Sequence, residues 1–294
     1  MFVATLFFVL AFFLGLLLGS FLNVCIARLP RYESIISPRS RCGSCGHAIR
    51  WYDNIPLLSC AVLRAKCRDC GGRISLVYPA VELVTGVWFA VAVYLGAGAL
   101  QIATLWAAGF LLIGLAVMDW QTQLLPDGFT LTGILLGMML VCTRTIFLGP
   151  HEGDVLLAKH HIELRAPGAT HDGGNIFLTG SESLIYGRMA AIAGAFLLLF
   201  AIRALYKLVR KRDGMGLGDA KLLAMIAAFL GFAPALFALF VGVCAATLYA
   251  VGLLLRGKAS GATRLPFGSF LAVGGMVSAL YGQAVVAWYT SLFR

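Results

Sequence analysis

Two aspartates lie beside long stretches that contain no charged side chain. Asp119 ends the uncharged run 83–118, and Asp219 precedes the uncharged run 222–255. Each acid is therefore expected at or just inside the edge of an apolar layer, where a carboxylate must be hydrated, paired or functional. Two carboxyl groups near one water share a proton, so the ionised one activates the water and the protonated one polarises a carbonyl. The pair predicts an aspartyl protease dyad.

A glycine-rich stretch, residues 214–219, leads into the second acid with the sequence Gly-Met-Gly-Leu-Gly-Asp. Glycines have no Cβ, so they let the backbone bend and let a substrate strand approach the carboxylate closely. The alternative is that both acids are interfacial residues that stay hydrated or pair with nearby Lys and Arg. An ionised Asp at the centre of a span costs about 2.5–3.5 kcal/mol and less near the interface, so this cost does not decide the matter.

Three further charged residues accompany the pair. Asp127 follows Asp119 by eight residues, and we expect it to be a turn or span-capping residue. Glu82 lies near the start of an apolar run, where a hydrogen bond between packed helices is its simplest role. Lys221 lies two residues after Asp219 and would not share its helix face, so we expect its side chain to extend to the membrane interface.

Four cysteines form two C-x-x-C knuckles with 21 residues between them, at positions 46–66. Each knuckle turns two thiolates toward one point, and four sulfurs fill the tetrahedral shell of a structural Zn²⁺ without leaving a position open for catalysis. The predicted ligands are Cys42, Cys45, Cys67 and Cys70. Thiol redox chemistry is the alternative, but a disulfide exchanger normally has its reactive cysteines on the oxidising side of a membrane, whereas this segment is basic and expected in the cytosol.

The composition indicates a membrane protein. Of the 294 residues, 60% are hydrophobic and 12% are charged, and the mean hydropathy is +0.90. A water-soluble globular protein would not tolerate this composition on its surface. The net charge of +10 does not indicate nucleic acid, because the Lys and Arg lie mainly in short segments between apolar runs. We therefore expect a lipid bilayer, and no nucleic acid, among the partners.

Eight uncharged or nearly uncharged runs predict an all-α polytopic membrane protein with about eight transmembrane helices. The first run, residues 1–27, lacks the basic start of a cleaved signal peptide and is longer than its apolar core. The other expected spans are 79–97, 99–119, 128–148, 185–206, 218–233, 235–255 and 266–290. In this topology the third span ends, and the sixth begins, on the side where Asp119 and Asp219 are expected to meet.

The polar segments complete the predicted domain organisation. Residues 28–78 carry nine Lys or Arg against three acids, and with the knuckles they predict a small cytosolic zinc-ribbon-like domain. This segment has few large apolar side chains, so the metal would supply much of its folding free energy. Residues 79–294 predict a seven-span membrane domain with an outer polar loop at 149–184. Four histidines lie in that loop, which we interpret as solvated rather than as a metal site.

Together these motifs resemble the bacterial type IV prepilin peptidases, which are bifunctional leader peptidases and N-methyltransferases of the GxGD aspartyl protease type. The stretches that carry the resemblance are Gly19–Pro30, both knuckles, Asn54–Ser59, Tyr78–Leu83, Asp119–Asp127, Gly214–Leu222 and Pro266–Gly268. The resemblance implies that Asp119 and Asp219 are catalytic. Two departures are an outer loop longer than the family usually carries and Gly43 in a knuckle position where proline is commoner.

The resemblance also implies partners and cofactors. The substrate would be a prepilin or pseudopilin with a short basic leader, cut on the cytosolic side before a hydrophobic helix. The new N-terminus would be methylated with S-adenosyl-L-methionine, and residues 28–78 are the expected methyltransferase region. The protein would be a multi-pass protein of the bacterial inner membrane, with its active site facing the cytosol.

Two other function classes fit parts of the pattern. A proton-coupled transporter uses intramembrane acids, but it would have them near the middle of the bilayer, whereas Asp119 and Asp219 are expected at one edge. A membrane thiol oxidoreductase would need the cysteines of residues 28–78 outside the cell. Reporter fusions that locate this segment in the cytosol would exclude the second class.

Overall fold

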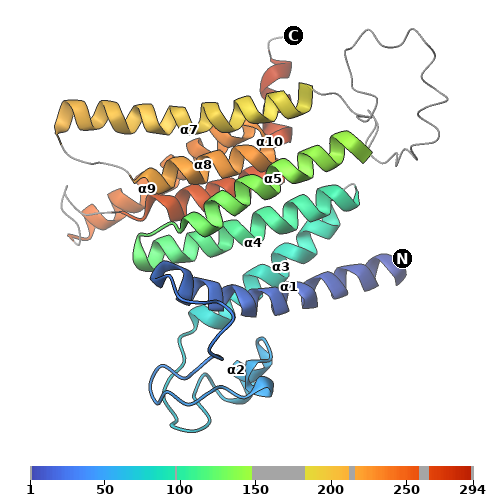
Figure 1. Ribbon diagram of the computed structural model, residues 1–294, viewed down its shortest axis with the longest axis vertical. Helices are drawn as coiled ribbons and strands as arrows, with labels where there is room; N and C mark the ends of the chain where they lie inside the picture. Colours follow the sequence, from blue (N-terminus) through green and yellow to red (C-terminus); the bar gives the residue numbers. More distant parts are fainter. Residues whose placement is uncertain (1, 97, 148–182, 212–215, 258–264, 293–294) are drawn as a thin grey trace.

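The structure is a computed structural model that describes residues 2–96, 98–147, 183–211, 216–257 and 265–292 (Figure 1). Its helices are α1 Phe2–Arg28, α2 Leu58–Val62, α3 Val77–Leu95, α4 Ala99–Thr122, α5 Asp127–Phe147, α7 Ser183–Arg210, α8 Leu217–Leu230, α9 Phe232–Leu255 and α10 Phe267–Ser291. Short 3₁₀ turns follow α1 at Leu29–Arg31 and precede α2 at Trp51–Asn54. Within these ranges the β structure consists of isolated bridges, so the all-α prediction is confirmed.

Seven of the described helices are long and apolar enough to cross a membrane. They are α1, α3, α4, α5, α7, α9 and α10, and each matches a predicted span. The remaining predicted span, 218–233, is helix α8, which has 14 residues. At about 1.5 Å per residue it extends about 21 Å, less than the hydrocarbon thickness of about 30 Å. The polytopic class is confirmed, and α8 is shorter than a full span.

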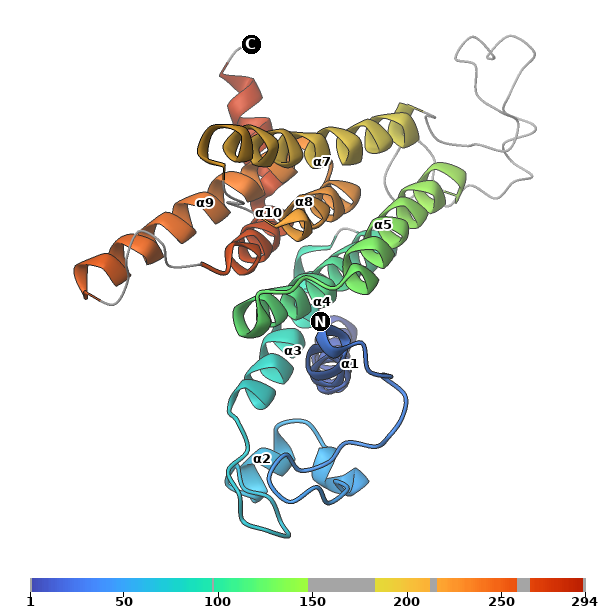
Figure 2. The same cartoon turned by 60° about the vertical axis from the view of Figure 1, so that its left-hand side comes forward.

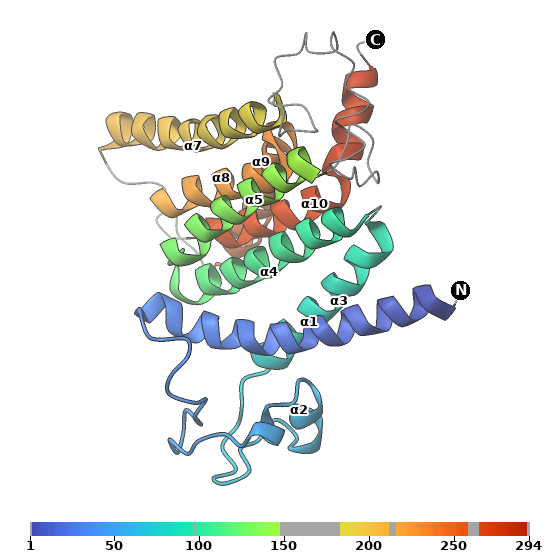
Figure 3. The same ribbon diagram turned by 45° about the vertical axis from the view of Figure 1, so that its right-hand side comes forward.

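Helix α8 lies at the centre of the bundle. It contacts α4, α5, α7, α9 and α10, and Figure 3 shows it between α7 and the helices below it. Each residue from Leu222 to Ala228 is at most 1% exposed. A helix that is apolar on all sides is stable where protein covers every side. Because its neighbours rather than lipid surround α8, its length does not have to match the bilayer.

Helices α1 and α3 pack closely through small residues. Figure 2 shows α1 nearly end-on beside α3. A Cβ atom on Gly15 would lie 2.8 Å from the Cα atom of Gly86, and one on Gly19 would lie 2.8 Å from the Cα atom of Glu82. Small residues allow this backbone approach in membrane helices. The ends of α1 and α3 thereby form a common support for the chain between them.

The chain between α1 and α3 forms a small domain around α2, below α1 in Figure 1. The C-terminal ends of α1 and α4 lie at the same end of the bundle as the N-terminal ends of α5 and α8 (Figure 1). These directions agree with the predicted alternation of the spans. The predicted outer loop, 149–184, lies almost entirely outside the described residues, as does Gly214.

Candidate functional site

Asp119 lies in the last turn of α4 and is held by the first turn of α10. Its side chain is 5% exposed. The backbone N–H of Ser269 donates to Asp119 Oδ2 at 2.7 Å. The Ser269 hydroxyl lies 3.1 Å from the same oxygen and 2.8 Å from the carbonyl oxygen of Ala116. Because one hydroxyl has one proton, Ser269 Oγ can donate to either acceptor, or it can accept a hydrogen bond from a protonated Asp119.

Asp219 occupies the first turn of α8, at the same end of the bundle. It is 7% exposed and accepts a hydrogen bond from the backbone N–H of Gly216. The carboxyl groups of Asp219 and Asp119 are close enough to interact electrostatically. The structure thus brings together the two acids that the sequence singled out, 100 residues apart in the chain.

Two glycines and one leucine close the space around the acids. A Cβ atom on Gly268 would lie 3.0 Å from Asp119 Cγ and 2.9 Å from Leu125 Cδ1. A Cβ atom on Gly218 would lie 2.9 Å from Leu125 Cβ. The missing side chains therefore let the start of α10 approach the end of α4, and let the starts of α8 and α10 approach Leu125 in the turn that follows α4. Sequence reasoning gave no role to Leu125 or to Ser269, although Pro266–Gly268, which directly precedes Ser269, was among the recognised stretches.

This arrangement suits acid–base chemistry. The N-terminal ends of α8 and α10 meet at the two acids, and the positive end of a helix dipole stabilises a negative charge within its first turn. Two close carboxyl groups do not ionise together easily, so one proton is shared between them. Asp119 and Asp219 can therefore offer a base and an acid side by side.

The other charged residues of this region have different surroundings. Asp127 begins α5 with a side chain that is 61% exposed, and its Oδ1 lies 2.6 Å from Lys221 Nζ. Lys221 therefore forms an ion pair with Asp127, a contact that the sequence did not indicate. This pair links the start of α5 to α8.

The four predicted metal ligands converge at one point of the small domain. The sulfur atoms of Cys42, Cys45, Cys67 and Cys70 all lie within 4.8 Å of one another. Cys42 Sγ lies 3.8 Å from Cys70 Sγ. A tetrahedral shell with Zn–S bonds of about 2.3 Å has sulfurs about 3.8 Å apart, whereas a disulfide needs about 2.05 Å. The cluster therefore fits a Zn²⁺ ion, and its four cysteines are free thiols.

The two knuckles are built alike. In the first, Cys42 N–H donates to the His47 carbonyl at 2.9 Å, and in the second Cys67 N–H donates to the Gly72 carbonyl at 2.8 Å. Each turn has a glycine in the left-handed region, Gly46 at φ 72° and Gly71 at φ 67°, which a residue with a side chain adopts with strain. The two knuckles that the sequence predicted thus share one backbone pattern.

Backbone N–H groups prepare the first knuckle for a metal. The N–H groups of Cys45 and Ser44 point to Cys42 Sγ and lower the pKa of this thiol to about 6. The distance from Ser44 N to the sulfur is 3.4 Å. Because the thiolate is the form that binds a metal, these contacts favour metal binding by Cys42. In the same knuckle a hydrogen bond from the His47 backbone opposes the shift, but burial and the neighbouring thiols raise the pKa of Cys45 to about 12.

An ion pair fixes the second knuckle to the preceding 3₁₀ turn. Arg68, between the two cysteines of this knuckle, donates from Nη2 to Asp53 Oδ1 at 2.7 Å and from Nε to Asp53 Oδ2 at 3.0 Å. These hydrogen bonds hold the pKa of Asp53 below its usual value. The guanidinium also lies 5.6 Å from the centre of the Tyr52 ring.

Glu82 joins α1, α3 and the small domain. Its side chain is 9% exposed, and Oε2 accepts the backbone N–H of Leu57 at 3.0 Å. It also forms a hydrogen bond with Ser20 of α1. The predicted packing hydrogen bond between helices is therefore present, and the contact with Leu57 adds a link that the sequence did not indicate.

The fold and these sites define a multi-pass membrane protein with two buried aspartates at one end of its bundle and a four-cysteine domain at the same end. A family model for the bacterial peptidase A24 N-terminal domain matches residues 13–95, and a model for the type IV leader peptidase family matches residues 173–251. The chain belongs to the type IV leader peptidase family.

Curated relatives agree with this assignment. A protein of Aeromonas hydrophila named prepilin leader peptidase/N-methyltransferase is 32% identical over 98% of this chain and 95% of its own length. A relative of the same name from Stutzerimonas stutzeri is 31% identical over 97% of this chain and 94% of its own length. Another, from Myxococcus xanthus, is 36% identical over 76% of this chain and 56% of its own length. No solved structure matches the chain significantly.

Proposed function

We propose that this protein cleaves the leader peptide of type IV prepilins and pseudopilins and methylates the new N-terminus. The observation that carries the peptidase half is the meeting of Asp119 and Asp219, both more than nine-tenths buried, at the end of α4 and the start of α8. The family and the names of its curated relatives support the substrate class and the methylation.

In the proposed cleavage, the aspartate pair starts with one shared proton. The ionised carboxylate takes a proton from a water molecule while the water oxygen attacks the scissile carbonyl carbon. The protonated carboxyl group donates its proton to the carbonyl oxygen. Collapse of the tetrahedral intermediate breaks the C–N bond, and a proton passes to the leaving nitrogen. The leader leaves with a new carboxylate, and the mature pilin has a new N-terminal amine.

The most direct test uses the purified full-length protein and a prepilin substrate. Mass spectrometry of the product's N-terminus, with and without S-adenosyl-L-methionine, should show a leaderless pilin in both reactions and a mass increase of one methyl group only with the methyl donor. An uncleaved substrate in both reactions would refute the peptidase proposal.

The cleavage rate should depend on pH in a bell-shaped manner. At low pH both carboxyl groups are protonated and no base remains, whereas at high pH both are ionised and no acid remains. The two limbs report macroscopic pKa values that belong to the pair and not to either residue. Initial rates on a prepilin across the pH range measure the profile. A rate that stays level as pH rises well past neutrality would contradict a shared proton.

The positive charges support a cytosolic orientation of this end of the molecule. Lys and Arg gather in three segments of the sequence, with nine in residues 28–78, four in 207–212 and three in 256–264. The described starts of these segments lie at the C-terminal ends of α1, α7 and α9, at the end of the bundle that holds the aspartates (Figure 1). Short cytoplasmic segments carry such an excess. We therefore place the small domain and the aspartates on the cytosolic side of the bacterial inner membrane.

The organisation of the chain follows from this orientation. Residues 1–27 form the first span, residues 28–78 form the cytosolic domain, and residues 79–294 form the protease membrane domain with the outer loop 149–184. The domain would hold a structural Zn²⁺ through Cys42, Cys45, Cys67 and Cys70, and the ion would stabilise the two knuckles. A filled four-sulfur shell leaves no open position, so the ion has no direct part in catalysis.

Deleting residues 32–76 should abolish methylation. This domain is the main polar surface available to a charged, nucleotide-like methyl donor, and its removal deletes that surface. Mass spectrometry of pilin that has already been cleaved would measure methylation separately from cleavage. If a folded deletion protein still methylated this product, the methyltransferase site would lie elsewhere.

A further inference from the structure

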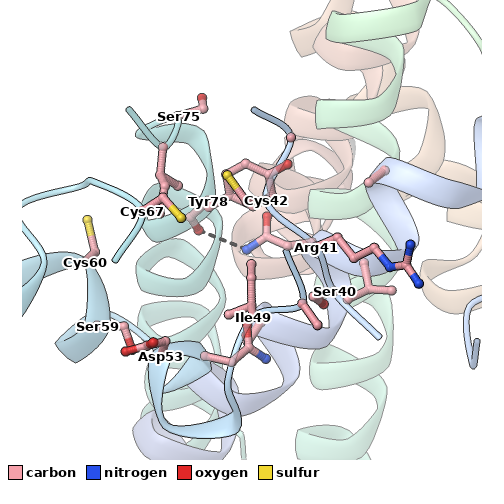
Figure 4. A pocket seen from close by; sticks show the side chains of 18 of the residues that line it. Ser40, Arg41, Cys42, Ile49, Asp53, Ser59, Cys60, Cys67, Ser75 and Tyr78 are labelled. Atoms are coloured by element: carbon pink, nitrogen blue, oxygen red, sulfur yellow. Dashed lines mark hydrogen bonds between the residues drawn. The ribbon is translucent and has the colours of Figure 1, made fainter. Parts of the chain in front are cut away.

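A cavity of about 580 Å³ lies between the small domain and the ends of α1 and α3. Its membrane side includes Ser20 and Asn23 of α1 and Glu82 of α3, and its opposite side includes residues of both knuckles. Figure 4 shows Arg41, Cys42 and Cys67 around this space, together with the hydrogen bond to the Tyr78 carbonyl that Asn23 donates at 3.0 Å. The volume is typical of sites for small organic ligands.

The deeply buried acid of this cavity, Glu82, has no cationic partner among the residues that the structure describes. The hydrogen-bond partners of Glu82 are the Leu57 backbone N–H and Ser20, which are both uncharged, and no ion pair of Glu82 occurs in the described part of the chain. Another acid of the cavity, Asp53, is already paired with Arg68. A buried carboxylate without a cationic partner attracts a positively charged ligand group.

The same cavity can also receive an anionic group. Arg41 and Arg73, which line it, form no side-chain hydrogen bond or ion pair within the described residues. Each lies in one of the β-bridges that flank the knuckles. A guanidinium binds a carboxylate through two parallel N–H donors. The cavity thus offers a negative group at its base and two free positive groups at its side.

These features fit one molecule of the proposed reaction. S-adenosyl-L-methionine carries a sulfonium cation, a carboxylate and an adenosine, and it is small enough for the cavity. We propose that this cavity binds S-adenosyl-L-methionine and that the carboxylate of Glu82 binds the sulfonium group of this molecule. This inference rests on the proposed methyltransferase function. The small domain and the membrane helices then form the site together.

Methyl transfer removes the positive charge of the molecule that is bound beside Glu82. A bond forms between the pilin's N-terminal nitrogen and the methyl carbon, the carbon–sulfur bond breaks with its electron pair going to sulfur, and the ammonium proton leaves to solvent. The sulfonium becomes a neutral thioether, S-adenosylhomocysteine. Glu82 therefore binds the donor more strongly than the product and favours exchange of one for the other.

This difference in charge gives the test. Isothermal titration of the full-length protein in detergent would measure the affinities for S-adenosyl-L-methionine and for S-adenosylhomocysteine. Glu82→Gln keeps an oxygen for the Leu57 N–H and removes only the charge. It should weaken binding of the sulfonium compound at least about 10-fold and binding of the thioether less than about 3-fold, because removing an ionic partner affects only the charged ligand. Methylation should fall while prepilin cleavage stays within about 2-fold.

The exposed Asp127, which does not line the cavity, provides the matched control. Asp127→Asn should leave both affinities unchanged. Equal weakening of both ligands by Glu82→Gln would show that Glu82 only supports the structure, and unchanged affinities would place the site elsewhere. Either result overturns the inference. The proposed function would fail in a different way, because wild-type protein would then leave prepilin uncleaved or would not bind the methyl donor.

Discussion

Asp119→Asn and Asp219→Asn should each lower prepilin cleavage by at least about 10²-fold. Asn keeps the size of the side chain and an oxygen acceptor, so the Ser269 N–H that lies 2.7 Å from Asp119 Oδ2 retains its partner. The substitution removes one of the two acid–base groups, and a loss of about this size is the low end for general acid–base catalysis. Substrate binding should persist. Initial cleavage rates of the purified variants, with binding of prepilin measured separately, would test both expectations.

The double variant, with both aspartates changed to Asn, should cleave prepilin only slightly more slowly than the slower of the two single variants. Groups that act as a unit have non-additive effects, because removing either one stops the shared step. Losses that multiply in the double variant would indicate that the two acids act independently.

Asp127→Asn is the matched control for these variants. Its side chain is 61% exposed and pairs with Lys221 on the surface of the site. Exposed ion pairs contribute little to stability, so this variant should keep clear activity. If folded Asp119→Asn cleaved prepilin at the wild-type rate while Asp127→Asn did not, the first catalytic role would pass to Asp127.

Much of the fold follows from the distribution of charge along the chain. A run without charges that is longer than about 20 residues can only be stable across a bilayer as a helix. For this reason the predicted runs 99–119 and 235–255 match α4 and α9 within a few residues. The predicted spans 218–233 and 235–255 are also separate helices, and the break lies at Gly231, whose φ of 97° favours glycine.

The structure adds features that depend on neighbours distant in the sequence. The apolar run that forms α8 has the sequence pattern of a membrane span. Hydropathy does not show that other helices surround it. Ser269 holds Asp119 from 150 residues away, and Lys221 pairs with Asp127 from 94 residues away. Such contacts depend on how helices pack, and no local pattern specifies them. The spacing of the knuckles, in contrast, predicted the cysteine cluster because its geometry is largely local.

Removing one ligand from each knuckle should cost the small domain its metal and its fold. We expect about one zinc per chain in the wild-type protein and almost none after Cys42→Ser and Cys67→Ser are combined. Zinc binding by such four-ligand sites is worth about 10–16 kcal/mol near neutral pH, more than a domain of this size gains from its apolar core. Metal analysis of protein purified without oxygen, together with limited proteolysis of residues 28–78, would measure both effects.

Cys60→Ser separates loss of a ligand from loss of any cysteine in this domain. Cys60 is half-buried and lies outside the four-sulfur cluster, so this variant should keep its zinc and its resistance to proteolysis.

In the variant that lacks Cys42 and Cys67, methylation should disappear with the zinc, because the knuckles form part of the cavity that Glu82 lines. Cleavage should decrease far less, since Asp119 and Asp219 are held by α4, α8 and α10. Wild-type protein that contains no metal after anaerobic purification would refute the zinc site and leave a labile pair of disulfides as the alternative.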